Sequence, residues 1–175
     1  AMSGTVERIP ASLWWHSLHA VLWDTGERAG AAMMLDWRWV DLSGGFVTFR
    51  AETRKGGKRD RIHRVHETTL AMMRRLNLAQ GRPTQGRCWP WSKHFTTLYY
   101  AYRRILLAAN LPTDRMRKFH AMRRSAASYL EAAGGNATEF LDHSDRRTTK
   151  RSYLDPRICG GDVTACDVLF RPTGT

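Results

Sequence analysis

The sequence predicts a mainly helical domain of the α+β class, in which one small antiparallel sheet lies between two groups of helices. Apolar residues recur at helical spacing over most of the chain, whereas strand-like stretches occur only between residues 46 and 65. The 175 residues are 42% apolar, which is enough for one packed core. We therefore expect residues 1–175 to form a single domain with helices before and after its sheet.

The first predicted helix follows Pro10 and ends at Gly26, a residue type suited to closing a helix. The tight turn after it presents Arg28, and residues 29–35 resume a helical composition. The apolar residues that predict the first helix recur at helical spacing; they are Leu13, Trp14, Leu18, Val21 and Leu22.

The sheet is predicted from two short stretches and the glycine-rich connector between them. Residues 46–49 are strand-like, and residues 59–65 are a weaker candidate because only Ile62 and Val65 are apolar. The connector Lys55-Gly56-Gly57-Lys58 has the glycine content of a hairpin turn. The predicted sheet therefore carries lysines at its tip.

The rest of the chain is predicted to be helical up to Pro156. A polar loop with Gly and Pro residues covers residues 80–92, and residues 157–175 form a tail with little periodicity. The helices are predicted over residues 67–79, 94–109, 118–133, 136–141 and 146–153.

The formal net charge of +12 indicates an acidic polymer or an anionic surface as partner, with nucleic acid the first candidate. Of the 28 basic residues, five are Lys and 23 are Arg, whose planar fork binds phosphate oxygens in pairs. A GC-rich genome produces the same bias toward Arg without any function, so both explanations of the excess remain open.

The three cysteines are Cys88, Cys159 and Cys166, and their number and spacing fit neither a disulfide framework nor a zinc site. No apolar run is long enough to span a bilayer, and no secretion signal is recognisable at the start. We therefore expect a soluble cytoplasmic protein without a bound metal. The opening Ala1-Met2-Ser3-Gly4 is unlike a natural start, so we expect the chain to be cut from a longer protein.

Five short segments carry residue types suited to phosphate chemistry, although each alone is unspecific. They are Asp24-Thr25-Gly26-Glu27-Arg28, Arg54-Lys55-Gly56-Gly57-Lys58, His120-x-x-Arg123-Arg124-Ser125, Leu141-Asp142-His143-Ser144-Asp145 and Thr148-Thr149-x-x-x-Tyr153. His120 and Arg123 lie one helical turn apart, so both can reach a single phosphate.

Taken in this order, the segments resemble the catalytic pattern of the tyrosine recombinases, the phage integrase family, over about residues 10–156. The family pattern is TGxR, a hairpin lysine, HxxR, LGHxS and a downstream tyrosine. The resemblance implies the helical catalytic fold of that family, with one small sheet. It also implies six catalytic residues, namely Arg28, Lys55, His120, Arg123, His143 and Tyr153.

Two positions depart from the family pattern. The family usually has Glu three residues after its first arginine, and this chain has Ala31, so a supporting carboxylate is missing. Asp142 replaces the glycine of LGH, and Asp tolerates left-handed backbone better than most residues. We therefore expect the turn before His143 to be retained. Neither departure removes a catalytic residue.

The resemblance implies that Tyr153 attacks a DNA phosphate, forming a 3′-phosphotyrosyl bond and freeing a 5′-hydroxyl. Two arginines and His143 would donate hydrogen bonds to the nonbridging oxygens. Lys55, or Lys58 as its competitor, would protonate the leaving oxygen, and His120 would accept or relay the tyrosine proton. Neither ATP nor a metal ion is needed. Further DNA contacts are expected from Lys58, Arg54 and Arg124.

The expected partners are double-stranded DNA and other recombinase protomers, four of which would assemble on DNA in the full-length, bacterial or phage-encoded protein. The N-terminal domain that completes the family's clamp around DNA is not expected in this chain. Two alternatives stay open: a noncatalytic DNA-binding module of the same fold, and a type IB topoisomerase that relaxes supercoils. We also expect few contacts to anchor the segment that carries Tyr153, because a loop and Pro156 bound it.

Overall fold

The computed structural model describes residues 4–57, 59–114 and 118–159, without the side chains of residues 156 and 157. The chain is mostly helical with small antiparallel sheets, so the predicted fold class is confirmed. It divides into two compact units, residues 1–123 and residues 124–175. A single domain over the whole chain stays a prediction.

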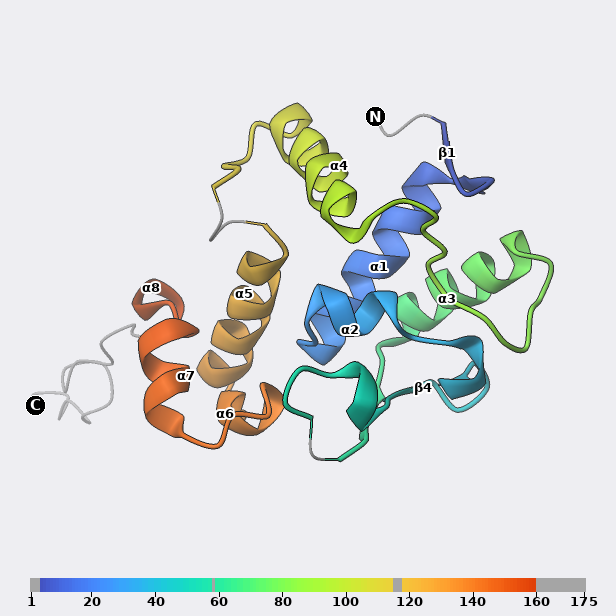
Figure 1. Cartoon of the computed structure of the whole chain (residues 1–175). Helices are drawn as coiled ribbons and strands as arrows, with labels where there is room; N and C mark the ends of the chain where they lie inside the picture. Colours follow the sequence, from blue (N-terminus) through green and yellow to red (C-terminus); the bar gives the residue numbers. More distant parts are fainter. Residues whose placement is uncertain (1–3, 58, 115–117, 160–175) are drawn as a thin grey trace, which may run out of the picture. The chain divides into compact units, whose positions relative to one another are not determined.

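The first unit is built around helix α1 (Ala11–Thr25), which lies beside α3 and α4 in Figure 1. Trp14, Leu18 and Val21 of α1 are completely excluded from solvent, as the helical spacing predicted. Gly26 ends the helix in left-handed backbone at φ 60°, and its N–H donates to the carbonyl of Leu22 at 3.0 Å. The short helix α2 (Ala29–Met33) follows directly, so the turn between them holds Arg28.

The sheet contains the predicted strand β4 (Phe46–Phe49), which pairs with both β3 (Val40–Asp41) and β5 (Arg61–Arg64) in antiparallel fashion. A 3-10 turn (Trp37–Trp39) precedes β3. The two-residue strands β1 (Thr5–Val6) and β2 (Ile9–Pro10) form a separate ribbon that the sequence did not predict. Such short pairings show no alternation that could be recognised in the sequence.

Helices α3 (Glu67–Ala79) and α4 (Phe95–Ala108) confirm two predicted helices. The loop between them is held against the core by tryptophan. The Trp89 indole donates to the hydroxyl of Ser17 at 3.0 Å, and Trp14 donates to the carbonyl of Pro90 at 3.2 Å. These hydrogen bonds satisfy polar groups that burial would otherwise leave unpaired.

The second unit has a small core of its own. Helix α5 (Phe119–Ala132) begins in the first unit and continues into the second, followed by α6 (Ala137–Phe140), α7 (Arg146–Ser152) and α8 (Pro156–Cys159). Helix α8 was not predicted. The core residues are contributed by α5, α6 and the segments after α6 and α7; they are Ala127, Ala137, Leu141 and Tyr153.

His19 of α1 makes the stability of the first unit depend on pH. Its ring packs 5.0 Å from that of Tyr102, and burial, assisted by the nearby charge of His16, lowers the pKa of His19 from 6.5 to about 4. A lowered folded-state pKa stabilises the fold above the unfolded value, and this contribution is lost as the pH falls toward 4.

Between pH 7 and pH 5, we expect protonation of His19 to cost wild type about 2 kcal/mol of its free energy of unfolding. His19→Phe keeps a ring but cannot be protonated, so we expect this part of the loss to be absent in the variant. Urea unfolding of both proteins at the two pH values measures the difference. An equal loss in the variant would show that other groups cause the pH dependence.

Candidate active site

A pocket of about 610 Å³ in the first unit is lined by four of the six predicted catalytic residues. They come from three distant segments: the turn before α2, the loop between β4 and β5, and the first turns of α5. The four residues are Arg28, Lys55, His120 and Arg123. The fold therefore brings together side chains that are up to 95 positions apart in the sequence, between Arg28 and Arg123.

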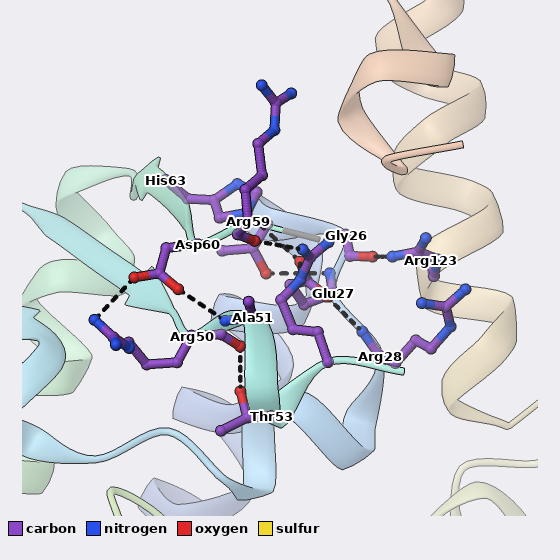
Figure 2. A network of polar contacts seen from close by, with 12 residues as sticks. Gly26, Glu27, Arg28, Arg50, Ala51, Thr53, Arg59, Asp60, His63 and Arg123 are labelled. Carbon is purple, nitrogen blue, oxygen red and sulfur yellow. Dashed lines mark hydrogen bonds and ion pairs between the residues drawn. The ribbon is translucent and has the colours of Figure 1, made fainter. Parts of the chain in front are cut away.

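Arg28 is fixed by its position at the start of α2. Its backbone is extended, and its N–H donates to Oε2 of Glu27 at 3.4 Å. The side chain is half-buried and lines the pocket. Figure 2 shows its guanidinium group on the same side of the polar network as that of Arg123. A phosphate in the pocket could therefore receive hydrogen bonds from two permanently charged groups.

Arg123 is more deeply buried than a DNA-facing side chain was expected to be. Only 3% of the residue is exposed, and Nη1 donates to the carbonyl of Gly26 (Figure 2). That hydrogen bond joins α5 to the turn before Arg28. Arg123 therefore supports the pocket as well as lining it.

His120 lies one turn before Arg123 on α5, half-buried at the pocket wall. The adjacent Phe119 stacks on Tyr102, with ring centroids 4.2 Å apart. This aromatic packing fixes the start of α5 against α4. The imidazole is thus carried on a helix turn that the core holds in place.

Lys55 is exposed at the rim of the pocket, on the loop between β4 and β5. This loop is longer than the predicted hairpin turn because β4 ends at Phe49 and β5 begins at Arg61, with a 3-10 turn (Ala51–Thr53) between them. A Cβ on Gly57 would lie 2.6 Å from the carbonyl of Ala51, so the chain closes tightly there. Lys58, the predicted competitor of Lys55, lies outside the described residues.

The base of the same loop is closed by Asp60. Its Oδ1 accepts from the Ala51 N–H at 2.8 Å, and its Oδ2 lies 2.9 Å from Nη1 of Arg50 (Figure 2). The loop therefore has a defined shape even though Lys55 itself is exposed.

Arg54, which the sequence suggested as a DNA contact, is buried. It is 6% exposed, its Nε donates to Oε1 of Glu27 at 2.8 Å, and Nη1 donates to the carbonyl of Arg59 at 3.3 Å. Burial of a guanidinium is tolerated because a carboxylate and a carbonyl replace water around it. Its hydrogen bonds therefore connect the loop that carries Lys55 to Glu27.

Glu27 is the residue of this site that sequence reasoning missed. It stands at the variable position of the TGxR segment and is 3% exposed at the pocket wall. Its Oε1 lies 3.8 Å from Nε2 of His63. Burial alone would raise its pKa, but His63 and the charges of Arg54 and Arg123 outweigh burial and lower the pKa from 4.5 to about 2. The only sequence signal was a charged residue within a turn between two apolar helices.

The other two predicted catalytic residues belong to the second unit, where they contact each other. The rings of His143 and Tyr153 meet edge to face with centroids 4.5 Å apart, and Nδ1 of His143 lies 3.0 Å from the Thr149 hydroxyl. Asp142 has φ 54°, so the left-handed turn expected before His143 is present despite the missing glycine. Arg124, a predicted DNA contact, is half-buried on α5.

Tyr153 is better anchored within the second unit than we expected. It follows the last residue of α7, is only 9% exposed, and its N–H donates to the Thr149 carbonyl at 2.9 Å. Its own carbonyl accepts from the Ser128 hydroxyl at 3.3 Å. Hydrogen bonds at both its backbone N–H and its carbonyl therefore hold the residue. Most of the predicted tail, residues 160–175, lies outside the described part of the chain.

The described residues contain neither a cluster suited to a metal ion nor a helix suited to span a membrane. Within residues 4–57, 59–114 and 118–159, no three His, Cys, Asp or Glu side chains are grouped so that they could hold a metal ion. None of the helices described for this chain combines the length and apolar character needed to cross a membrane.

No family model and no curated protein sequence matches the chain. Among solved structures it is similar to the crystal structure of XerA recombinase, with a TM-score of 0.70 and 19% sequence identity. The similarity covers 91% of this chain and 59% of the recombinase chain, so the chain spans little more than half of that protein's length. On this comparison, the chain has the fold of a tyrosine-recombinase catalytic domain.

Proposed function

We propose that the chain is the catalytic domain of a site-specific DNA recombinase that cuts and rejoins strands through a 3′-phosphotyrosyl intermediate. The observation that carries this proposal is the pocket in which Arg28, Lys55, His120 and Arg123 meet from three segments. The similarity of fold to XerA recombinase supports it independently. A set of cations around a pocket of this size suits a phosphodiester better than a neutral ligand.

In the proposed reaction the Tyr153 oxygen attacks phosphorus, the bond from phosphorus to the 5′-oxygen breaks, and the tyrosine ester conserves the phosphodiester energy. Arg28 and Arg123 neutralise charge on the nonbridging oxygens, and His143 donates a further hydrogen bond. Lys55 gives its proton to the departing 5′-oxygen, while His120 accepts the tyrosine proton. Rejoining reverses these transfers with the 5′-hydroxyl of another strand, so neither ATP nor metal is consumed.

The proposed partners are double-stranded DNA and further protomers that assemble as a tetramer on it. The net charge of +12 supports DNA as the partner. The tetramer is proposed from the resemblance of the five sequence segments to the catalytic pattern of the tyrosine recombinases.

We expect DNA binding to weaken steeply with salt, because arginine and lysine contacts to phosphates release counterions. Each phosphate neutralised adds about 0.9 to the slope of log affinity against log salt concentration. Fluorescence anisotropy with a labelled duplex between low and physiological salt measures this slope. Affinity that stays constant with salt would contradict a phosphate-based interface.

Trapping on a nicked suicide duplex tests the proposed function. Cleavage just upstream of a nick releases a short 5′-hydroxyl fragment that diffuses away, so the protein remains attached to the DNA. We expect a band of protein-linked DNA that survives denaturing electrophoresis and disappears after protease treatment. If binding occurs without such a band, also when an N-terminal clamp domain of the recombinase type is supplied, the chain is a noncatalytic DNA-binding module.

A type IB topoisomerase would also form this band, so a second readout is needed. A topoisomerase relaxes supercoiled plasmid without exchanging partners, whereas a recombinase joins strands from two duplexes. Ligation of the trapped strand to a second labelled duplex that carries a 5′-hydroxyl end, without plasmid relaxation, supports the recombinase.

A further inference from the structure

The ion pair between Glu27 and Arg54 is almost completely enclosed within the first unit. The two side chains are 2% and 3% exposed, and Arg54 Nε lies 2.8 Å from Glu27 Oε1. A buried pair of this kind contributes little net stability, but removal of one partner leaves an uncompensated charge in the interior. The role of the pair is therefore to be sought in the segments that it joins and not in its contribution to stability.

The pair connects two segments that both reach the pocket. Glu27 immediately precedes Arg28 and accepts its N–H, so the carboxylate is fixed to the turn before α2. Arg54 immediately precedes Lys55, and its second hydrogen bond, to the Arg59 carbonyl, crosses the lysine loop. The ion pair thus ties the backbone on one side of Lys55 to the backbone of Arg28.

We propose that Glu27 is a positioning residue which, through Arg54, holds the Lys55 loop over the pocket at Arg28. This inference rests on the proposed function, because it assigns Glu27 to the same site. The family pattern has Glu three residues after its first arginine, and this chain has Ala31 at that position. The buried carboxylate at this site is instead that of Glu27, directly before Arg28.

The surroundings of Glu27 are consistent with a carboxylate that stays ionised. Arg54, His63 of β5 and Arg123 of α5 face it from three elements, and their effect lowers its pKa to about 2 despite burial. The amide of Glu27→Gln has nearly the same size but no charge. This substitution weakens the hold on Arg54 while changing the packing little.

Hydrogen exchange of the chain without DNA tests the positioning directly. We expect Glu27→Gln to speed amide exchange in residues 51–60 by about tenfold, because one partner of a buried pair is lost. Asp36→Asn is the matched control, since Asp36 is also a buried carboxylate paired with an arginine, Arg38, at 2.9 Å, but does not line the pocket. Unchanged exchange in Glu27→Gln, or equal acceleration in Asp36→Asn, overturns the proposal.

A double variant covers the case in which Glu27→Gln does not fold. Glu27→Gln combined with Arg54→Gln removes both charges of the ion pair, so we expect its melting temperature to exceed that of the single variant. The connection is nevertheless absent, so exchange in residues 51–60 stays fast. Exchange as slow as in wild type would show that the ion pair does not hold the loop.

Cleavage kinetics with two leaving groups identify the residue through which Glu27 acts. In ordinary DNA the 5′-oxygen needs a proton, whereas a 5′-bridging sulfur leaves as thiolate, since a thiol has a pKa of about 8.5 and water about 15.7. With an oxygen substrate we expect Glu27→Gln to cleave about a hundredfold more slowly, at the lower end of what a positioned general acid contributes. With the sulfur substrate we expect a rate close to wild type.

These outcomes distinguish the positioning role of Glu27 from the proposed covalent reaction. Equal slowing on both substrates means that Glu27 acts on the arginines and overturns its role in placing Lys55. Wild-type cleavage of both substrates by Glu27→Gln overturns the positioning role altogether. If wild type forms no covalent complex with either substrate, the proposed function fails, and the exchange experiment alone decides whether Glu27 holds the loop.

Discussion

Replacement of Tyr153 by Phe is expected to abolish the covalent DNA complex while leaving the protein folded and able to bind DNA. The substitution removes only the hydroxyl, which is the proposed nucleophile, and no other group on the ring can form an ester with phosphorus. The ring packs within the core of the second unit, edge to face with His143, and Phe preserves this packing. We expect the free energy of unfolding to change by no more than about 1 kcal/mol, the net contribution of one hydrogen bond.

Nicked-duplex trapping of wild type and Tyr153→Phe side by side, with anisotropy for DNA affinity, measures both effects. Tyr129→Phe is the matched control, because Tyr129 also lies in the second unit but is 56% exposed and outside its core. A covalent band that persists in Tyr153→Phe would assign the nucleophile to another residue. A band lost equally in Tyr129→Phe would show that the loss is not specific to the Tyr153 hydroxyl.

Replacement of Arg28 by Ala is expected to slow cleavage by about 10²–10³-fold, the effect of removing one donor to transition-state charge. Arg28 is the better of the two pocket arginines for this test. Its side chain is half-buried, whereas the guanidinium of Arg123 also supports the Gly26 carbonyl. Removal of Arg123 would therefore disturb the turn as well as the proposed chemistry.

Single-turnover cleavage of the suicide duplex at saturating protein gives the rate without a contribution from binding. Arg82→Ala is a suitable control, because Arg82 lies in the loop after α3 and does not line the pocket. Arg28→Lys separates charge from geometry, since Lys keeps the charge but loses the planar fork. A rate for Arg28→Ala close to wild type would exclude Arg28 from the reaction.

The helices were predictable because their signals are local. The range 67–79 was predicted from apolar spacing alone and matches α3, and Gly26 ends α1 in the left-handed conformation that its residue type favours. The short strands β1, β2 and β3 were not predicted, because two residues cannot show a period of two. The length of the loop between β4 and β5 was underestimated, because Asp60 closes its base by a hydrogen bond to Ala51, nine residues earlier in the chain.

The candidate site was predictable in composition but not in burial. Arg28, Lys55, His120 and Arg123 were identified from motif order, and the pocket brings them together. The burial of Arg54 and Arg123 was not foreseen, because it depends on partners distant in sequence, namely Glu27 and the Gly26 carbonyl. A charged residue in a single sequence carries no sign of whether an opposite charge will meet it in the interior.

The central claim, that Tyr153 links the chain to DNA, is tested most directly by mapping the covalent adduct. Wild type is trapped on a nicked duplex, the complex is digested with trypsin and nuclease, and the nucleotide-bearing peptide is sequenced by mass spectrometry. We predict a 3′-phosphonucleotide on Tyr153, in the tryptic peptide of residues 152–157. Attachment of the nucleotide to a different residue, or a peptide that carries no nucleotide although DNA is cut, would contradict the account.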